Sequence, residues 1–343
     1  MTPMTADLDR FLDAVPPALV ERLGAARRVL AVSHENPDAD TIGASLGVGA
    51  IVAAGGGTAD LVCTDAVPPL YGFIAGVERF RTDPDPAVAY DLIVVSDCGS
   101  LDRVCAVAGR HPELFARTPW VVIDHHASNG ASDAADWVDP LSAATCEMVA
   151  LLALRMGVPL DADDGRLGAA LIAGIVMDTA TFAHPNTTAR TLAVAGALVA
   201  AGAPLAEASR RLYRTKPEVQ LRLFGRVLDR LESAAGGRIV HADLRDADLA
   251  ATGTQPSHSE GIIDLLAQSE WADVAILFKE GPDGTTRISV RTRPGGVDAT
   301  ALTGTFGGGG HARAAGATLG TPLDAARPVV LAEAERLLAA LPG

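Results

Sequence analysis

The stretch that decides the fold reads SHENPDADTIGAS and covers residues 33–45. It follows an apolar run, residues 28–32, that predicts a buried strand. It leads into residues 40–54, whose small and apolar side chains predict a helix. Open α/β sheets bind their ligands in loops of this kind, beyond the carboxyl ends of the strands. The stretch therefore predicts an α/β fold with a functional site in this loop.

The same stretch carries a histidine and two aspartates within seven residues, His34, Asp38 and Asp40. Imidazole and carboxylate groups are ligands for divalent transition metals. Asn36 and Pro37 predict a turn, and on non-helical backbone Asp38 and Asp40 can point to the same side, so that each could serve one of two metals. The alternative is that Asp40 only caps the helix and Pro37 only shapes the turn.

The pattern recurs at later strands. Residues 59–63 form a second apolar run, a third ends on Asp97, and a fourth ends on Asp124, His125 and His126. Because the carboxyl ends of parallel strands meet at one edge of a sheet, we expect these polar side chains to lie near the first loop.

Helical segments separate the strands, and they are expected at residues 41–54, 102–109, 143–155 and 168–177. Alternating strands and helices predict a mainly parallel sheet with helices on both faces. The last helix runs into Asp178. A carboxylate at a helix C-terminus is unfavourable because the helix dipole there attracts cations, and a bound metal would resolve this conflict.

The remaining chain predicts a second domain. At 343 residues the sequence is too long for one typical core. We expect a metal-binding domain at residues 1–190, a helical connector at 191–235, and a smaller α/β domain with a mixed sheet at 236–343. The second domain should contain strands near residues 238–243, 273–278 and 286–291, a glycine-rich loop and a final helix.

Composition and charge argue against several classes of function and location. The formal net charge of −14 works against binding of long nucleic acid, which needs a basic surface. Residues 192–208 are too weakly apolar and too broken to span a bilayer, and the N-terminus does not resemble a signal peptide. The four cysteines lack CxxC spacing, which argues against zinc knuckles and disulfides. We expect a cytoplasmic protein.

Together the strand-end residues form one candidate site: His34, Asp38, Asp40, Asp97, Asp124, His125, His126 and Asp178. Five carboxylates at one edge would repel one another unless cations lie among them. Two metals about 3.5–4 Å apart, bridged by one carboxylate, fit this number of ligands and suit phosphoryl displacement.

The sequence closely resembles the DHH phosphoesterase superfamily. The motif in residues 34–45, Asp97, the Asp-His-His at 124–126 and Asp178 are similar to its four motifs, in the same order. Residues 289–291 and 307–316 resemble the DHH-associated C-terminal domain. Length and architecture are similar to the stand-alone group of nanoRNases, pAp phosphatases and cyclic-dinucleotide phosphodiesterases. Ala39 stands where this group usually has glycine, which removes no ligand.

The resemblance implies two divalent metal ions, with Mn²⁺ expected and Mg²⁺ or another ion as the alternative. The implied ligands are His34 and Asp38 for the first ion, Asp40, His125 and Asp178 for the second, and Asp97 as the bridge. The resemblance also implies that Asp97 and His126 are the catalytic residues. His126 is implied to face the scissile phosphate, as an acid or an electrostatic stabiliser. We interpret Asp124 as the residue that orients an imidazole.

The glycine-rich segment is interpreted as part of the substrate site. Consecutive glycines let backbone N–H groups approach a phosphate closely, although such a run can also be a plain flexible loop. The expected substrate-binding residues, which would hold the far end of the substrate, are Ser289, Arg291, Gly308, Gly309, Gly310, His311 and Arg313.

The function implied is hydrolysis of short oligoribonucleotides and linear dinucleotides such as pApA to mononucleotides, with pAp 3′-phosphatase and cyclic di-AMP phosphodiesterase activities as possible additions. An inorganic pyrophosphatase-like hydrolase and a non-catalytic nucleotide sensor are the alternatives. The expected partners are short RNA or dinucleotide substrates, without long nucleic acid or a membrane; a homodimer is left open.

Overall fold

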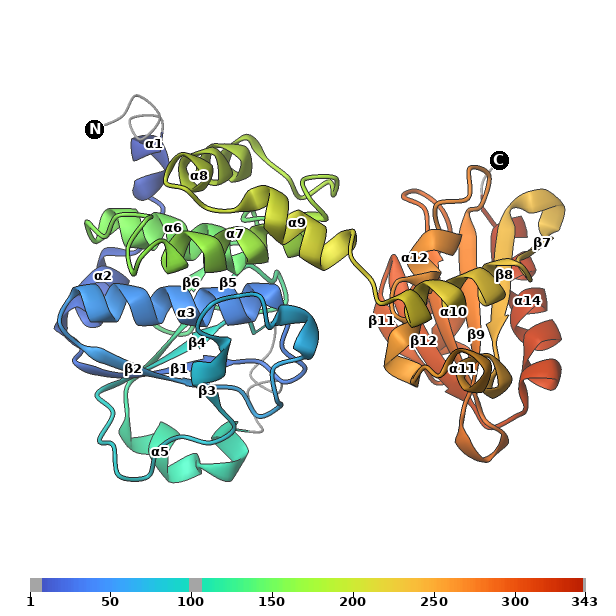
Figure 1. Cartoon of the computed structure of the whole chain (residues 1–343), viewed down its shortest axis with the longest axis horizontal. Coiled ribbons are helices and arrows are strands. Elements are labelled where there is room, and N and C mark those ends of the chain that lie inside the picture. The colour runs from blue at the N-terminus through green and yellow to red at the C-terminus, as the bar shows by residue number, and fades with distance from the viewer. Residues whose placement is uncertain (1–7, 99–106, 342–343) are drawn as a thin grey trace. The chain divides into compact units, whose positions relative to one another are not determined.

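The computed structural model describes residues 8–98 and 107–341 (Figure 1). It divides into two compact units, Met1–Thr215 and Lys216–Gly343. Most of the helix expected at residues 102–109 lies outside the described residues. The expected α/β fold, with a parallel sheet followed by a mixed sheet, is confirmed.

The first unit is built on a six-stranded sheet of order β3-β2-β1-β4-β5-β6, in which every described pair is parallel. The strands are β1 Arg28–Ser33, β2 Thr58–Val62, β3 Phe80–Arg81, β4 Leu92–Ser96, β5 Trp120–Asp124 and β6 Trp137–Val138. The central strands are apolar on both sides because both faces are covered. Val29 and Ala31 of β1 belong to the core on the α3 side, whereas Leu30 and Val32 belong to the core on the other face.

Helices cover the two faces unequally. Figure 1 shows α3, α6 and α7 stacked over one face of the first sheet and α5 beneath the other. The helices of this unit are α1 Asp9–Leu12, α2 Pro17–Ala25, α3 Ala39–Ala54, α5 Pro112–Arg117, α6 Thr145–Arg155, α7 Arg166–Thr179, α8 Ala189–Ala200 and α9 Leu205–Tyr213. Among the described residues, no single helix is long and apolar enough to cross a membrane, and only α8 and α9 together, bent by 113°, meet that test.

The second unit has a mixed six-stranded sheet of order β11-β12-β10-β9-β8-β7, in which only β8 and β9 pair in parallel among the described strands. Its strands are β7 Glu232–Ala234, β8 Ile239–Leu244, β9 Val274–Glu280, β10 Thr286–Thr292, β11 Gly309–His311 and β12 Ala314–Leu319. Its helices are α10 Glu218–Leu228, α11 Asp246–Thr252, α12 Ile262–Leu266, α13 Ala299–Gly304 and α14 Leu323–Ala339.

The residues expected to form a connector, 191–235, are divided between the two units. Helices α8 and α9 bury Leu198 and Leu212 in the core of the first unit. Helix α10 buries Leu223 and Phe224 in a core of the second unit. The boundary therefore follows the burial of apolar side chains and falls after Thr215.

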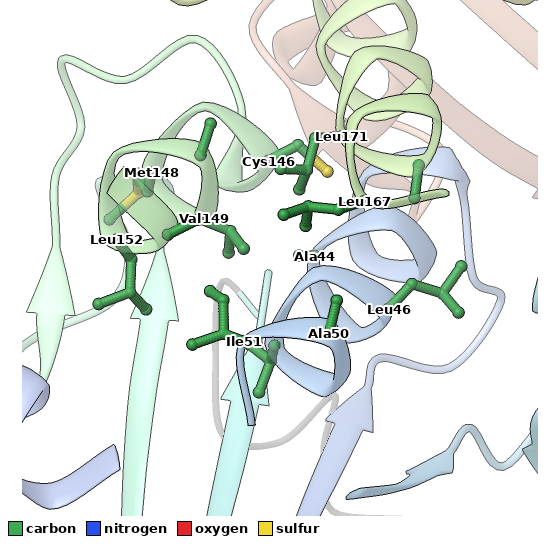
Figure 2. Close-up of a cluster of buried hydrophobic side chains, with 14 of the residues drawn as sticks. Ala44, Leu46, Ala50, Ile51, Cys146, Met148, Val149, Leu152, Leu167 and Leu171 are labelled. Atoms are coloured by element: carbon green, nitrogen blue, oxygen red, sulfur yellow. The ribbon is translucent and has the colours of Figure 1, made fainter. Parts of the chain in front are cut away.

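Helix α3 is the centre of the first core, and it approaches its neighbours closely. Figure 2 shows Ala44, Ile51 and Val149 packed among side chains of α3, α6 and α7. A Cβ atom on Gly43 would lie 2.5 Å from the backbone oxygen of Ala170 on α7. Only glycine permits this contact between α3 and α7, and the contact fixes the start of α3, where Asp40 lies.

We predict that Gly43→Ala lowers the free energy of unfolding by about 1–3 kcal/mol, because the added methyl group overpacks the α3–α7 contact. Gly196→Ala is the matched control, since Gly196 lies in helix α8 with no atom within 4 Å of an added Cβ. This control should raise stability by up to about 1 kcal/mol through helix propensity. Urea unfolding of both variants checks the prediction, and equal effects would contradict it.

Candidate metal centre

The predicted ligands lie at the carboxyl edge of the first sheet and at the ends of the helices beside it. His34 follows β1, Asp97 follows β4, and His125 follows β5. Asp178 lies in the last turn of α7, at the C-terminal position that the sequence predicted. Parallel pairing of β1, β4 and β5 places the three strand ends next to one another.

His34 is buried with both ring nitrogens engaged. Its Nδ1 lies 2.6 Å from the Glu35 carbonyl oxygen. Its Nε2 lies 3.5 Å from Asp97 Oδ2 and 4.0 Å from Asp38 Oδ2. A neutral imidazole that donates from Nδ1 to the carbonyl keeps the Nε2 lone pair for a metal, which is the usual arrangement of a histidine ligand.

The two aspartates of the first motif occupy different backbone settings. Asp38 is the N-cap of α3, and its Oδ1 accepts from the backbone N–H groups of Asp40, at 2.9 Å, and Thr41, at 3.1 Å. The expectation that both aspartates lie on non-helical backbone is wrong, because Asp40 lies inside the first turn of α3. The alternative that Asp40 caps this helix is also wrong, since Asp38 does so.

Asp40 is instead held by the next helix in the layer. Its carboxylate accepts from the backbone N–H of Thr145, at 2.7 Å, and that of Cys146, at 2.9 Å. These N–H groups are in the first turn of α6, where the helix dipole favours a negative charge. Asp40 is fully buried, so this contact orients a carboxylate that water does not reach.

Asp97 is the centre of the cluster. Its carboxylate oxygens lie 3.5 Å from His34 Nε2, 3.5 Å from His125 Nε2 and 3.6 Å from His126 Nδ1. Thr145 Oγ1 donates to Oδ1 at 3.2 Å. The backbone of Asp97 is left-handed, with φ of 58°, which turns the chain sharply after β4. Burial opposes ionisation, yet hydrogen bonds from His125 and His34 lower the pKa of Asp97, so it is a carboxylate at neutral pH.

The donor atoms form groups that suit metal binding. Three such groups have their donor atoms within 4.8 Å of one another: His34, Asp38 and Asp97; Asp40, His125 and Asp178; and Asp97, His125 and His126. Asp178 Oδ2 lies 3.1 Å from His125 Nε2. Burial raises the pKa of Asp178 to about 6 and that of Asp40 well above its usual value. Divalent cations would offset this cost, so the residues fit two metals.

His126 differs from His125 in its contacts. Its Nδ1 lies 2.8 Å from Asp124 Oδ1, and its backbone N–H donates to the same oxygen at 3.2 Å. Asn129 Nδ2 donates to Asp124 Oδ2 at 2.9 Å. Asp124 is fully buried, whereas the His126 side chain is 31% exposed. This carboxylate thus orients His126, and Nε2 is the ring nitrogen left to face a ligand.

The second unit contains a cavity of about 720 Å³ beside β10 and β12. Of the expected substrate residues, Ser289 and Gly308 line it, together with Lys279, Arg287 and Gly316. The other five do not line it: Arg291, Gly309, Gly310, His311 and Arg313.

The glycine-rich segment is more ordered than the expected loop. Gly309–His311 forms β11, which pairs antiparallel with β12. A Cβ atom on Gly308 would lie 2.2 Å from the Gly316 carbonyl oxygen, so close backbone approach explains this glycine. Arg291 forms an ion pair with Asp264, with Nε 3.0 Å from Oδ1.

Three residues that contribute to these sites were not among the candidates from the sequence. Lys279 and Arg287 face each other across β9 and β10 and supply the positive charge of the cavity. The alternation of β10 could have indicated Arg287, because it shares a face with Ser289. Thr145 was missed because its contact with Asp97 spans 48 residues of sequence.

Comparison with known proteins gives consistent matches. Residues 28–175 match the DHH family, N-terminal domain, and residues 236–340 match the DHHA1 domain. A bifunctional oligoribonuclease and PAP phosphatase of Thermus thermophilus is 34% identical over 87% of this chain and 86% of its own length. A Bacillus subtilis protein of the same description is 26% identical over 93% of this chain and 97% of its own. An exopolyphosphatase-related protein from Bacteroides fragilis shares the fold, with a TM-score of 0.81, 22% identity and 98% coverage of both chains.

We predict that Mn²⁺ stabilises the wild-type protein, by about 2.7 kcal/mol at 100 times its dissociation constant, because cations bind the ordered carboxylates of the folded state. Asp97→Ala should abolish this gain, since the Asp97 carboxylate lies 3.5 Å from His34 of one proposed ligand group and 3.5 Å from His125 of the other. Thermal unfolding with and without Mn²⁺, together with elemental analysis, measures the effect. Unchanged metal content in Asp97→Ala would contradict the bridging assignment.

Proposed function

The chain belongs to the DHH phosphoesterase family, and we propose that it is a metal-dependent hydrolase that cleaves short oligoribonucleotides and linear dinucleotides to mononucleotides and removes the 3′ phosphate from pAp. The observation that carries this proposal is the cluster of imidazoles and carboxylates around Asp97. The descriptions of the Thermus and Bacillus relatives support the substrate class.

The proposed ligands of the first metal are His34 and Asp38, those of the second are Asp40, His125 and Asp178, and Asp97 is shared. When bound, two divalent cations supply a nucleophilic water and stabilise the attacking and leaving oxygens. The chain's own contribution is to hold the donor atoms in place: α6 holds Asp40, and Thr145 holds Asp97. Mn²⁺ is the proposed ion because the donor set mixes oxygen and nitrogen.

His126 is proposed to act on the substrate. Its Nδ1 is engaged by Asp124, so Nε2 faces the substrate; in the imidazolium form of His126 it can donate a proton or a hydrogen bond to the phosphate or to the leaving oxygen, and in the neutral form it accepts. Asp124 holds the Nδ1 proton and the ring orientation, as the buried aspartate of a catalytic triad does. Because the His126 side chain is partly exposed, a ligand can reach it.

The cavity of the second unit is proposed to bind the nucleotide part of the substrate. Lys279 and Arg287 suit a phosphate, and burial together with the neighbouring Arg287 lowers the pKa of Lys279, a shift that a phosphate would oppose. Asp246, Glu260 and Glu280 line the same cavity and would repel further phosphates. We therefore expect a preference for short substrates, because the cavity has only two cations and the chain as a whole is acidic.

The glycine-rich hairpin remains a second proposed contact. His311 and Arg313 are exposed at its tip, so their side chains are accessible to a ligand. The cytoplasmic location and the homodimer stay predictions from the sequence.

The direct test is a substrate panel with Mn²⁺: pAp, pApA, cyclic di-AMP, inorganic pyrophosphate and RNAs of increasing length. We expect the highest kcat/KM for pApA and RNAs of a few nucleotides, and turnover that falls with length. Preference for pyrophosphate would favour a pyrophosphatase, and binding of nucleotides without turnover of any substrate would favour a sensor.

We predict that His126→Ala keeps its metal content while kcat falls by roughly 10²- to 10⁴-fold, the usual scale for a lost acid or charge stabiliser. Asp124→Asn should act in the same direction, because it allows the wrong tautomer of His126. Steady-state kinetics and elemental analysis measure the two quantities. Loss of metal in His126→Ala would mean that the roles of His125 and His126 are exchanged.

We predict that Arg287→Ala lowers kcat/KM for pApA by about 10-fold or more, through loss of a charge-assisted phosphate contact. Hydrolysis of bis-p-nitrophenyl phosphate should hardly change, since this small ester needs only the metal site. Arg222→Ala is the control, because Arg222 is an exposed helix arginine paired with Glu218. Arg313→Ala tests the hairpin, and a larger loss there than in Arg287→Ala would move the nucleotide site from the cavity to the hairpin.

A further inference from the structure

The backbone that follows Asp178 is held in an uncommon conformation. Ala180, Thr181 and Phe182 are consecutive non-glycine residues with φ of 46°, 60° and 65°. Left-handed backbone is disfavoured for residues with a Cβ atom, and a run of three needs support from its surroundings. Part of the support is local, because Thr179 Oγ1 accepts from the Phe182 N–H at 2.9 Å and donates to Ile175 O at 2.6 Å.

Helix α9 supplies support from outside. The Tyr213 hydroxyl donates to the backbone oxygen of Met177 at 2.5 Å, one residue before Asp178. Ser209 Oγ lies 3.0 Å from Thr181 Oγ1, three residues after Asp178. Helix α9 therefore forms hydrogen bonds with the chain on both sides of Asp178, the proposed metal ligand.

The backbone of Asp178 itself is also engaged. Its carbonyl oxygen accepts from Asn186 Nδ2 at 3.2 Å and lies 3.0 Å from His184 Nδ1. These contacts satisfy the carbonyl group of Asp178 at the end of α7. The end of α7 that carries Asp178 is therefore held by the segment that follows it as well as by α9.

We propose that Tyr213 and Ser209 are positioning residues for the Asp178 carboxylate, so that helix α9 tunes the affinity of the second metal. The inference rests on the proposed metal site. Tyr213 is the last residue of α9, and the second unit begins at Lys216. Tyr213, close to the end of the first unit, is thus hydrogen-bonded to the backbone next to Asp178. In this proposal, that hydrogen bond helps to set the position of the Asp178 carboxylate.

The test measures metal binding directly in the full-length protein. We expect Tyr213→Phe to weaken the binding of one of two Mn²⁺ ions by about 3- to 10-fold, the range for one lost hydrogen bond. Ser209→Ala should act in the same direction. In both variants kcat should fall at limiting Mn²⁺ and recover at saturating Mn²⁺. Isothermal titration of the metal-free protein with Mn²⁺ reports affinity, and steady-state assays report the recovery.

Tyr90→Phe is the matched control, because the Tyr90 hydroxyl donates to Asp60 at 2.5 Å, and neither residue is a proposed ligand. It should leave Mn²⁺ affinity unchanged. Wild-type affinity in both Tyr213→Phe and Ser209→Ala, or an equal loss in Tyr90→Phe, overturns the inference. Asp178→Ala separates the two proposals: if it loses one Mn²⁺ while both α9 variants bind two ions with wild-type affinity, only the positioning role fails, and if it keeps both ions the metal site itself fails.

Discussion

A buried carboxylate surrounded by imidazoles is the interaction on which the first unit depends. Asp97 lies 3.5 Å from His34, 3.5 Å from His125 and 3.6 Å from His126, while its own side chain is almost fully buried. Such a charge is tolerated only with close partners of opposite charge or with a metal. The sheet places imidazoles beside it that can donate to the carboxylate or hold a metal with it, because β1 and β5 flank β4 on either side and each is followed by a histidine.

The helices over the sheet supply two further carboxylates of the candidate metal site. Asp40 lies at the start of α3 and Asp178 at the end of α7. These two helices pack closely at Gly43 of α3 and Gly174 of α7. A Cβ atom on Gly174 of α7 would lie 2.6 Å from Asp40 Oδ1, so glycine at this position leaves space for the carboxylate. Tight packing in this layer therefore has a functional consequence, since a shift of either helix displaces a candidate ligand.

The proposed role of the second unit is to bind the phosphorylated ligand. An acidic protein with this function would bind such a ligand without a general attraction for nucleic acid. Its cavity joins two cations, Lys279 and Arg287, with three acidic side chains. Under the proposed function, this mixture would favour a ligand with few phosphates.

Much of this could be predicted from the sequence, because short-range patterns determine it. Apolar runs that end in His34, Asp97 and His125 predict parallel strands with polar ends, and their parallel pairing then places them together. Other features depend on contacts between residues far apart in sequence. Asp40 is held by α6 and not by its own helix, Arg287 and not Arg291 lines the cavity, and the boundary between the units follows where α8 to α10 bury their apolar sides. Local sequence specifies which groups are available, and only tertiary packing decides which backbone N–H groups and which faces they meet.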